Sequence, residues 1–316
     1  MQLKNIFVLG GSGFVGSAVV AKLDAAGYSV TVLTRRLESA KHLILLPHVK
    51  VVECDVLDYH ALNAALRGAD AVINLIGILH QTRRIRFNTI HHQLPEQLAR
   101  ICVDLGVKRL LHMSALRAEQ SAPSQYLQSK AAGEAAVMAQ RDKVNVTVFK
   151  PSVIFGRHDQ FVNLFASLIK LLPVIVLAKP QAKFQPVWVE DVATSFLNSL
   201  ENKSTYGQVY ELAGPNVYTL QTLMEIVMAT LGEKRPIIGL NDALSYVQAF
   251  FMELLPVRLM SRDNVRSMAL DSIAQLPMSA TLGVQATSLE AVIPEYLADK
   301  TQRSAYDRHR SLAGRR

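Results

Sequence analysis

Residues 6–16 read Ile-Phe-Val-Leu-Gly-Gly-Ser-Gly-Phe-Val-Gly. The four apolar residues predict a short buried strand, and Val19, Val20 and Leu23 recur at helical spacing beyond the glycines. A strand, a tight turn and a helix N-terminus together form an anion site, because backbone N–H groups and the helix dipole point at an arriving phosphate. The stretch therefore predicts a dinucleotide-binding turn.

Three glycines at a spacing of three each have a predicted task in this turn. We expect Gly10 to permit the turn, Gly13 to let the backbone approach a pyrophosphate, and Gly16 to let the helix pack close to the strand. The residues expected to contact the cofactor here are Gly10, Gly11, Ser12, Gly13, Phe14, Val15 and Gly16.

Length and composition suit a large α/β protein. The chain has 316 residues, of which 50% are hydrophobic, and its mean hydropathy is +0.18. No apolar run reaches the roughly 18 residues of a membrane-spanning helix, and because the chain starts with a core strand we expect no signal peptide. Two cysteines, Cys54 and Cys102, argue against a disulfide framework, so we expect the reducing cytoplasm.

The formal net charge is +8 and the isoelectric point is about 9.5. Such a charge fits a solvated basic surface, and it equally favours anionic partners such as a phosphorylated cofactor or anionic lipid. Nucleic acid is not expected, because no basic stripe interleaves with aromatic residues. No metal is expected either: His91 and His92 adjoin on a predicted helix, so their side chains diverge.

Strand and helix patterns alternate through the first half of the chain. After the opening unit, the predicted strands are 29–34, 49–53, 71–76 and 109–114, and the predicted helices include 59–66 and 87–105, the latter ending at Gly106. This alternation predicts a doubly wound parallel sheet of the Rossmann type.

We expect three parts along the chain. Residues 1–150 form the dinucleotide-binding domain, residues 151–299 form a smaller C-terminal α/β lobe interleaved with it, and residues 300–316 form a basic, disordered tail. The tail is also a candidate electrostatic tether to an anionic membrane.

The end of the second strand bears on cofactor choice. An acidic residue near this point bonds the ribose 2′-hydroxyl of NAD, whereas arginine accommodates the 2′-phosphate of NADP. Here the chain has Arg35 and Arg36 and no acid, which favours NADP(H), with NAD(H) as the alternative cofactor. The competing interpretation is a pair of exposed loop arginines.

The ends of the third and fourth strands supply further expected cofactor contacts. Asp55, beside Val56, is placed to reach the adenine edge, and a turn-forming or N-capping role fits it equally well. The fourth strand leads into Leu75 and Ile76, and Gly77 then lets the cofactor pass closely.

One tyrosine and one lysine form the candidate catalytic pair. Tyr126 and Lys130 are four residues apart on a predicted helix, so both lie on one face. A lysine ammonium favours the phenolate and is expected to lower the tyrosine pKa. The tyrosine then exchanges a proton with a substrate while nicotinamide exchanges hydride. The competing interpretation is a surface pair.

The glycine turn, this pair and the stretch 150–156 together resemble the extended short-chain dehydrogenase/reductase superfamily. More narrowly, four segments resemble an atypical branch, often named nucleoside-diphosphate-sugar epimerase-like, that includes the Rossmann-type accessory subunit of respiratory complex I and its bacterial relatives. These segments are 112–116, 126–134, 151–161 and 185–193. The resemblance spans roughly residues 4–230.

The resemblance implies NADP(H) bound across the sheet edge, with Tyr126 and Lys130 beside the nicotinamide and with Pro151 and Val153 among its contacts. It implies a third catalytic hydroxyl at the end of the fifth strand. Ser114 is the candidate, although it sits one or two positions early. The helix asparagine of the superfamily corresponds to His91 here.

The second half carries fewer signals. Residues 161–172 trace an apolar helix face, and Trp188 either lines a pocket or packs in the core. We also expect Thr219 to cap a helix that ends at Gly232. Residues 246–260 are unusually apolar, which predicts either a helix covering the lobe or a surface for lipid, a quinone-like molecule or a partner.

These observations lead to one hypothesis with an alternative. The chain is an NADP(H)-binding protein, either an oxidoreductase or epimerase or a cofactor-stabilised accessory protein linked to respiratory complex I or quinone metabolism. It is cytoplasmic, with a peripheral position at the inner face of the membrane and a respiratory-complex or membrane-surface partner as further expectations. The alternative is an active nucleoside-diphosphate-sugar epimerase or dehydratase, for which Arg157, Arg258 and Arg262 are candidate diphosphate anchors.

Overall fold

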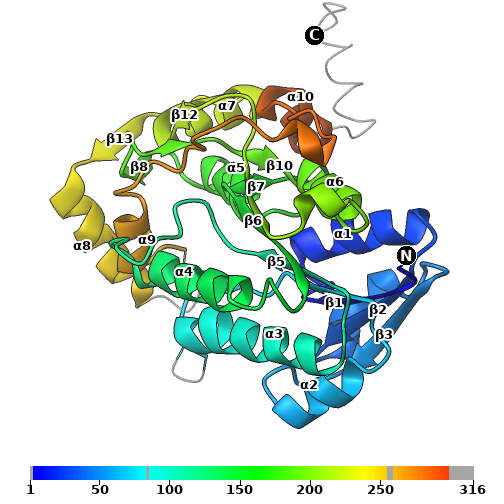
Figure 1. The fold of residues 1–316 in the computed structure, drawn as a ribbon. Helices are drawn as coiled ribbons and strands as arrows, with labels where there is room; N and C mark the ends of the chain where they lie inside the picture. Colours follow the sequence, from blue (N-terminus) through cyan, green and yellow to red (C-terminus); the bar gives the residue numbers. More distant parts are fainter. Residues whose placement is uncertain (1–2, 83–84, 255–258, 299–316) are drawn as a thin grey trace, which may run out of the picture.

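A seven-stranded parallel sheet organises the computed structural model, which describes residues 3–82, 85–254 and 259–298 (Figure 1). The strand order is β11-β6-β5-β4-β1-β2-β3. From β1 the chain adds β2 and β3 on one side and then β4, β5 and β6 on the other, so the order of the strands reverses between β1 and β4. The strands are β1 (Asn5–Leu9), β2 (Ser29–Thr34), β3 (Val49–Glu53), β4 (Ala71–Asn74), β5 (Arg109–Met113), β6 (Asn145–Pro151) and β11 (Gln208–Leu212). The predicted doubly wound Rossmann fold is confirmed.

Helices cover both faces of this sheet. On one face α1 (Phe14–Ala25) packs against α6 (Val189–Ser199), and Val19, Val20 and Phe196 are fully buried there. The other face is covered by α2 (Tyr59–Ala65), α3 (Leu94–Asp104) and α4 (Gln125–Met138). A short 3₁₀ helix, η1 (Leu37–Leu43), follows β2.

The helix predicted over residues 87–105 is present, with one local difference. Its first part, η2 (Asn88–Gln93), is π-helical and leads directly into α3. Pro95 has no N–H for the carbonyl of His91. That carbonyl faces α4 instead, where a Cβ on Gly133 would overlap it, so the glycine permits the close approach. The predicted end is confirmed, because Gly106 adopts the left-handed conformation with φ 68°.

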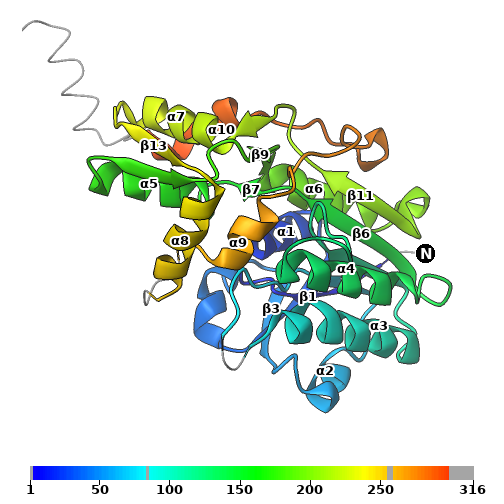
Figure 2. The same cartoon turned by 90° about the vertical axis from the view of Figure 1, so that its left-hand side faces the viewer.

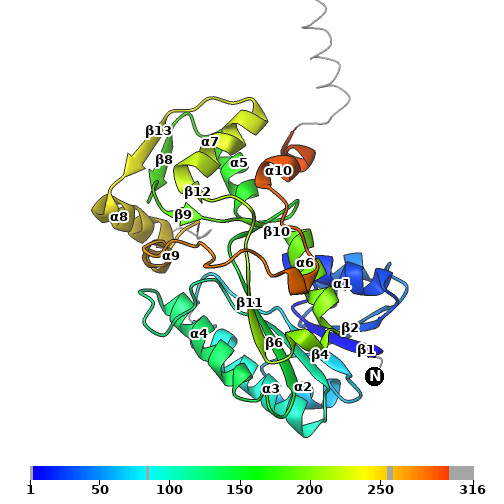
Figure 3. The ribbon, with the colours of Figure 1, turned by 45° about the horizontal axis from the view of Figure 1, so that its top comes forward.

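A smaller lobe sits beside the sheet (Figure 3). Its core lies among three helices and includes Phe165, Ile169, Leu223, Val227 and Ile293. Its helices are α5 (Val162–Leu171), α7 (Leu220–Leu231), α8 (Asp242–Glu253), α9 (Arg262–Ser267) and α10 (Leu289–Leu297). The 3₁₀ turns η3 (Lys203–Thr205) and η4 (Ala280–Leu282) pack against the large sheet instead: Thr205 bonds Arg109, and Leu282 lies in the sheet core. Its strand pairs are β7 (Ile154–Phe155) with β10 (Val187–Trp188), β8 (Ile175–Ala178) with β13 (Ile237–Leu240), and β9 (Lys183–Phe184) with β12 (Tyr218–Thr219).

The predictions made for the second half of the chain can be compared with the structure. The Thr219 side chain accepts the N–H of Thr222 and caps α7, which ends at Gly232 with φ 73°, both as expected. Trp188 is half-buried and packs against the core of the lobe. Residues 300–316 lie outside the described part of the chain. Within the described residues, no helix is long and apolar enough to cross a membrane.

The second half of the chain also completes the large sheet. Strand β11 pairs with β6 along its full length, from Gln208 opposite Thr147 to Leu212 opposite Pro151. A buried arginine joins the parts: Arg109, at the start of β5, donates to the carbonyl oxygens of Ser199 and Leu200 at the end of α6. Since those carbonyls form the negative end of the α6 dipole, the cation is well placed.

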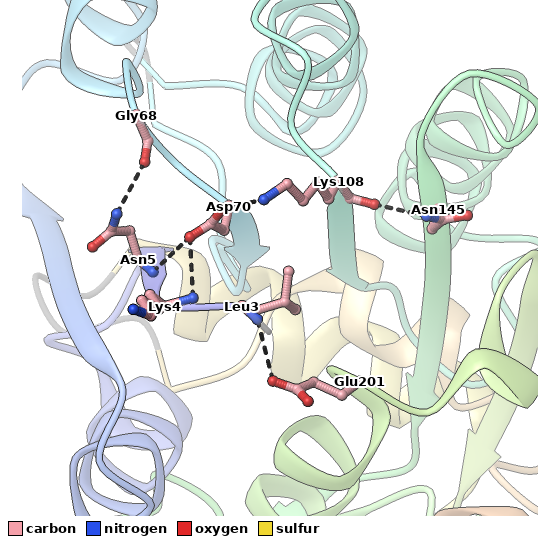
Figure 4. Close-up of polar contacts among 8 residues, drawn as sticks. All are labelled: Leu3, Lys4, Asn5, Gly68, Asp70, Lys108, Asn145 and Glu201. Atoms are coloured by element: carbon pink, nitrogen blue, oxygen red, sulfur yellow. Dashed lines mark hydrogen bonds and ion pairs between the residues drawn. The ribbon is translucent and has the colours of Figure 1, made fainter. Parts of the chain in front are cut away.

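A carboxylate ties together the amino ends of three strands, at the edge opposite the glycine turn (Figure 4). Asp70 accepts the backbone N–H groups of Lys4 and Asn5, both at 3.0 Å, and the amine of Lys108 at 2.6 Å. The hydrogen bond from Lys108 is the main reason that the pKa of Asp70 falls to about 2. This cluster holds the amino ends of β1, β4 and β5 together, whereas the glycine turn lies at the carboxyl ends of the strands.

Candidate dinucleotide site

The glycine turn lies between β1 and α1, at the point where the sheet order reverses. Gly10 has a φ of 79°, and a Cβ there would lie 3.1 Å from the backbone nitrogen of Ile76, so the predicted need for glycine is confirmed. A Cβ on Gly16 would overlap the carbonyl oxygen of Gly10. Gly16 therefore lets the helix fold back onto the turn itself, rather than onto the strand as expected.

The N-terminus of α1 is left available to a ligand. Its N-cap is Gly13, which has no side chain to accept the first N–H groups of the helix. Gly13 is exposed, and a Cβ built on it would meet only the carbonyl oxygen of Gly10, at 3.3 Å. This geometry suits an anion, because unpaired N–H groups and the positive end of the helix dipole coincide.

The other residues of the turn hold it in place. Gly11 is buried, and a Cβ there would lie 2.9 Å from a methyl group of Val32. Ser12 and Val15 are half-buried. The ring of Phe14 reaches the second lobe, where a Cβ on Gly156 would lie 3.3 Å from two of its atoms.

The candidate 2′-phosphate residues follow β2 at the same edge of the sheet. Arg35 and Arg36 are both exposed, and neither takes part in an ion pair within the described ranges of the chain. The backbone around them is fixed, because the Thr34 hydroxyl donates to the carbonyl oxygen of Arg36 at 3.1 Å. Two uncompensated cations beside the glycine turn make an electropositive edge.

The ends of β3 and β4 lie along the same edge. Asp55 is exposed and accepts the N–H of Leu57 at 3.1 Å, so it forms a turn, while Asp58 caps α2. Val56 and Leu75 are buried, and Ile76 is half-buried. Strand β4 ends two residues earlier than predicted.

Gly77 has a neighbour that the sequence did not reveal. A Cβ on Gly77 would lie 3.2 Å from the amine of Lys130 and 3.7 Å from Nε2 of His91. The missing side chain thus makes room for these two groups, whereas we expected it to make room for the cofactor.

Tyr126 and Lys130 lie in the first turns of α4, as predicted. Lys130 is only 3% exposed, and its amine donates to the carbonyl oxygen of Met113, at the end of β5, at 3.1 Å. The half-buried Tyr126 ring meets Phe87 and His91 edge to face, with centroid distances of 5.8 and 5.4 Å.

The expected electrostatic effect of the lysine on the tyrosine is wrong in this structure. Burial raises the pKa of Tyr126 to about 12, and burial lowers the pKa of Lys130 to about 8. Desolvation penalises both charged forms, and it outweighs any stabilisation of a phenolate by the ammonium. The Tyr126 phenol is therefore neutral at pH 7, rather than a tuned phenolate.

Ser114 is buried at the end of β5 and is engaged elsewhere. Its hydroxyl donates to a carboxylate oxygen of Glu134 at 2.8 Å, and Glu134 also pairs with Lys150 at 3.4 Å. The side chain is held by this carboxylate on α4.

Two buried histidines, His91 and His112, lie near Tyr126 and Lys130, and His91 is the one bonded to the tyrosine's helix. Ile78 donates its N–H to Nε2 of His91 at 3.0 Å, which leaves the proton on Nδ1 to bond Ser129. The Ser129 hydroxyl in turn donates to the carbonyl oxygen of Tyr126 at 2.8 Å. Burial, aided by Lys130 and then His112, lowers the pKa of His91 to about 2. His91 thus anchors the backbone of Tyr126 through Ser129.

His112 lies deeper still. Its Nδ1 accepts from the side-chain amide of Asn74 at 3.1 Å, while its buried Nε2 has no partner among the described residues. Burial, with a smaller effect of Lys130, lowers its pKa to about 3. The sequence did not predict the contact between Asn74 and His112, because residues on adjacent strands carry no shared local signal.

The second lobe caps the helix of the candidate pair. Asp263, on α9, accepts the backbone N–H groups of Gln125 at 2.9 Å and of Tyr126 at 3.0 Å. The N-cap residue Ser124 accepts the N–H of Leu127 and is itself bonded by Ser267 of α9. A carboxylate at a helix N-terminus is stabilising, so α9 holds α4 in position.

Two groups of predicted residues remain: the expected cofactor contacts after β6 and the candidate diphosphate anchors. Pro151 is buried, Val153 is half-buried, and the carbonyl of Val153 accepts the N–H of Val187. Of the anchors of the alternative hypothesis, Arg157 is exposed, and Arg262 is held by Glu253 through its backbone and guanidinium. Arg258 lies outside the described residues. In the described part of the chain, no three His, Cys, Asp or Glu side chains are grouped to hold a metal.

A family model for the NAD-dependent epimerase/dehydratase family matches residues 6–213. The chain belongs to this family. The glycine turn, α4 and all of the seven-stranded sheet except Asn5 lie within the matched range.

Two relatives within this group are complex I subunits. The mitochondrial NADH dehydrogenase [ubiquinone] 1 alpha subcomplex subunit 9 of Arabidopsis thaliana is 35% identical over 235 residues, which cover 72% of this chain and 58% of that protein. The subunit of the same name in Dictyostelium discoideum is 30% identical over 252 residues, covering 78% and 70%. The resemblance to complex I accessory subunits is confirmed, although it spans only part of the plant protein's length.

Solved structures support the fold of this epimerase/dehydratase family member. A dTDP-glucose 4,6-dehydratase from Streptomyces venezuelae, with NAD and TYD bound, matches with a TM-score of 0.71 at 19% identity. The match covers 98% of each chain. At this identity the likeness establishes the architecture of both lobes.

Proposed function

We propose that this protein binds NADP(H) and acts as a cofactor-stabilised accessory protein linked to respiratory complex I or quinone metabolism. The observation that carries the proposal is a contrast within one site. The open N-terminus of α1 and the glycine turn would suit a pyrophosphate, whereas the Ser114 hydroxyl already donates to Glu134 at 2.8 Å and is not free to donate to a substrate. A bound dinucleotide would stabilise the fold by mass action.

The residues present fit such a cofactor. The turn from Gly10 to Gly16 would hold the pyrophosphate, and Arg35 and Arg36 would pair with a 2′-phosphate. Asp55 and Val56 would border the adenine. The nicotinamide end would meet residues that follow β4 and β6 and that lie on α4, namely Leu75, Ile76, Gly77, Tyr126, Lys130, Pro151 and Val153.

The bound cofactor would supply hydride exchange at its nicotinamide ring. Tyr126, with its pKa raised to about 12, would hold its proton at pH 7 and donate it to a substrate oxygen. Lys130 would bond the cofactor ribose, and His91 would keep the backbone of Tyr126 in place through Ser129. With Ser114 engaged by Glu134, we expect turnover to be weak.

We further propose a location in the cytoplasm, at the inner face of the membrane, with a respiratory complex as partner. The similarity to subunits of mitochondrial NADH dehydrogenase supports this partner.

Titration of the purified protein with NADPH and NADH, followed by fluorescence, tests the cofactor. We expect NADPH to bind about tenfold or more tightly than NADH, and the double variant Arg35→Ala/Arg36→Ala to lose that preference. Arg141→Ala, at an equally exposed arginine far along the chain, is the matched control and should keep it. Absence of binding, or a preference that survives the double variant, would refute the proposal.

The accessory role has a separate test. In cells that lack the gene, Tyr126→Phe should restore respiratory growth as well as the natural protein does, and NADPH should raise the melting temperature of both proteins equally. A variant that binds NADPH but fails to restore growth would indicate an enzyme instead.

A further inference from the structure

Helix α8 presents an apolar face to solvent. Ser245 and Ala249, on the side that packs against the lobe, are fully buried. On the opposite side Phe251 is 62% exposed and Leu254, at the helix end, is 69% exposed. We call this side the outer face of α8; its members, at helical spacing, are Leu244, Val247, Phe250, Phe251 and Leu254.

Hydrogen bonds on the inner side fix this orientation. The Ser245 hydroxyl accepts the N–H of Lys179, at the end of β8, at 3.0 Å. The side chain of Gln248 donates to the carbonyl of Val176 on β8, also at 3.0 Å. Rolling the helix to bury its outer face would break both bonds, so the exposure is built into the lobe.

The edge of the outer face is cationic and aromatic. Arg262 and Arg266, on α9, lie over the ring of Tyr246, with distances of 5.9 and 5.7 Å to its centroid, and Arg262 lies 5.1 Å from that of Phe250. Arg262 is paired with Glu253, whereas among the described residues the Arg266 guanidinium bonds the Tyr246 hydroxyl and no carboxylate. From Glu253 to Leu270 the sequence has three arginines and two carboxylates; Glu253 pairs with Arg262, and Asp263 is occupied by α4.

Area and charge together select one occupant for this surface. The five side chains expose on the order of 500 Å², which is less than the roughly 800 Å² per partner of a stable protein interface. An apolar helix face bordered by arginine and aromatic residues instead suits the boundary between lipid headgroups and acyl chains. Figure 1 shows α8 at the periphery of the molecule, and Figure 2 confirms that α8 and α9 lie together on one side.

We propose that the outer face of α8 docks on the surface of an anionic lipid bilayer, with Arg266 at the level of the phosphate groups. This inference deepens the location given under the proposed function, and it does not depend on the dinucleotide site.

Co-sedimentation of the full chain with vesicles tests the proposal. We expect binding to phosphatidylcholine vesicles that contain phosphatidylglycerol, and about fivefold weaker binding by Phe251→Gln/Leu254→Gln. Leu45→Gln is the matched control, because Leu45 is 87% exposed and lies outside this lobe, in the loop after η1. Arg266→Gln should lose only the advantage that phosphatidylglycerol confers.

Two results would overturn the proposal. The first is that the natural protein stays in the supernatant with phosphatidylcholine vesicles both with and without phosphatidylglycerol. The second is that the double variant sediments as well as the natural protein. Light scattering adds a third check: a dimer that the double variant dissociates would assign the face to a second copy of the chain. NADPH titration of the same variants should be unchanged, so failure here is distinguishable from failure of the cofactor site.

Discussion

A carboxylate oxygen of Asp263 accepts the backbone N–H of Tyr126 at 3.0 Å, across 137 residues of chain. We expect Asp263→Ala to reduce the free energy of unfolding by about 1 kcal/mol, as loss of a helix cap does. Hydrogen exchange should also accelerate at the amides of Gln125 and Tyr126. Asp58→Ala, which removes the cap of α2, is the matched control; it should destabilise equally without affecting those amides. Unchanged exchange in Asp263→Ala would contradict the capping role.

Gly13 offers a test of the turn that spares the fold. Because a Cβ there meets a single backbone oxygen, at 3.3 Å, Gly13→Ala should lower the melting temperature far less than Gly16→Ala does. We expect its affinity for NADPH to fall about tenfold or more, since the methyl group occupies the approach of the pyrophosphate. Gly16→Ala should instead destabilise the protein, because its Cβ overlaps Gly10. Undiminished affinity in Gly13→Ala would place the ligand elsewhere.

Burial of Lys130 makes stability depend on alkaline pH. Its pKa is about 8 in the folded protein against an ordinary 10.5, so between these values the unfolded chain binds the extra proton and stability rises with pH. Below pH 8 the cost of the buried charge is fully present. Lys130→Met should therefore be about 1–3 kcal/mol more stable than the natural protein at pH 7. That gain should shrink as the pH approaches 9.5 in urea unfolding.

Exposed Lys143 provides the control for this measurement. Lys143→Met should follow the natural protein across the same pH range. A gain in Lys130→Met that is constant with pH would mean that the buried charge is not its cause.

Asp70 predicts the opposite dependence at acid pH. Its pKa is lowered from 3.8 to about 2, so its stabilising contribution is complete above pH 4 and is lost as the pH falls toward 2. After allowance for solvent screening, Asp70→Asn should cost about 1 kcal/mol at pH 7. The difference from the natural protein should vanish near pH 2. The exposed pair of Glu96 and Arg100 is the control, and Glu96→Gln should change stability far less.

The fold could be predicted because its signals are local. A strand, a glycine turn and a helix follow one another within residues 5–25, and the alternation of apolar segments then implies a parallel sheet. The residues that mark helix ends, such as Gly106 and Thr219, also act within one turn of a helix. Tyr126 and Lys130 share a face for the same reason.

The chemistry of the site could not be predicted in the same way. Whether Ser114 faces Tyr126 or Glu134 depends on how β5 and α4 pack, and that is a long-range outcome. The pKa of Tyr126 depends on burial, which no spacing of residues reveals. The apolar pattern of α8 likewise shows that a face exists without showing which way it turns, and here Ser245 and Ala249 take the inner side.

The position of β11 has a consequence for how the protein is made. Until residues 208–212 have left the ribosome, β6 has no neighbour on its outer side and its backbone groups are open to other chains. A fragment that stops at residue 150 would keep that edge permanently and would also lose the α6 carbonyls that hold Arg109. We therefore expect products that are truncated before α6 and β11 to aggregate in place of binding NADPH.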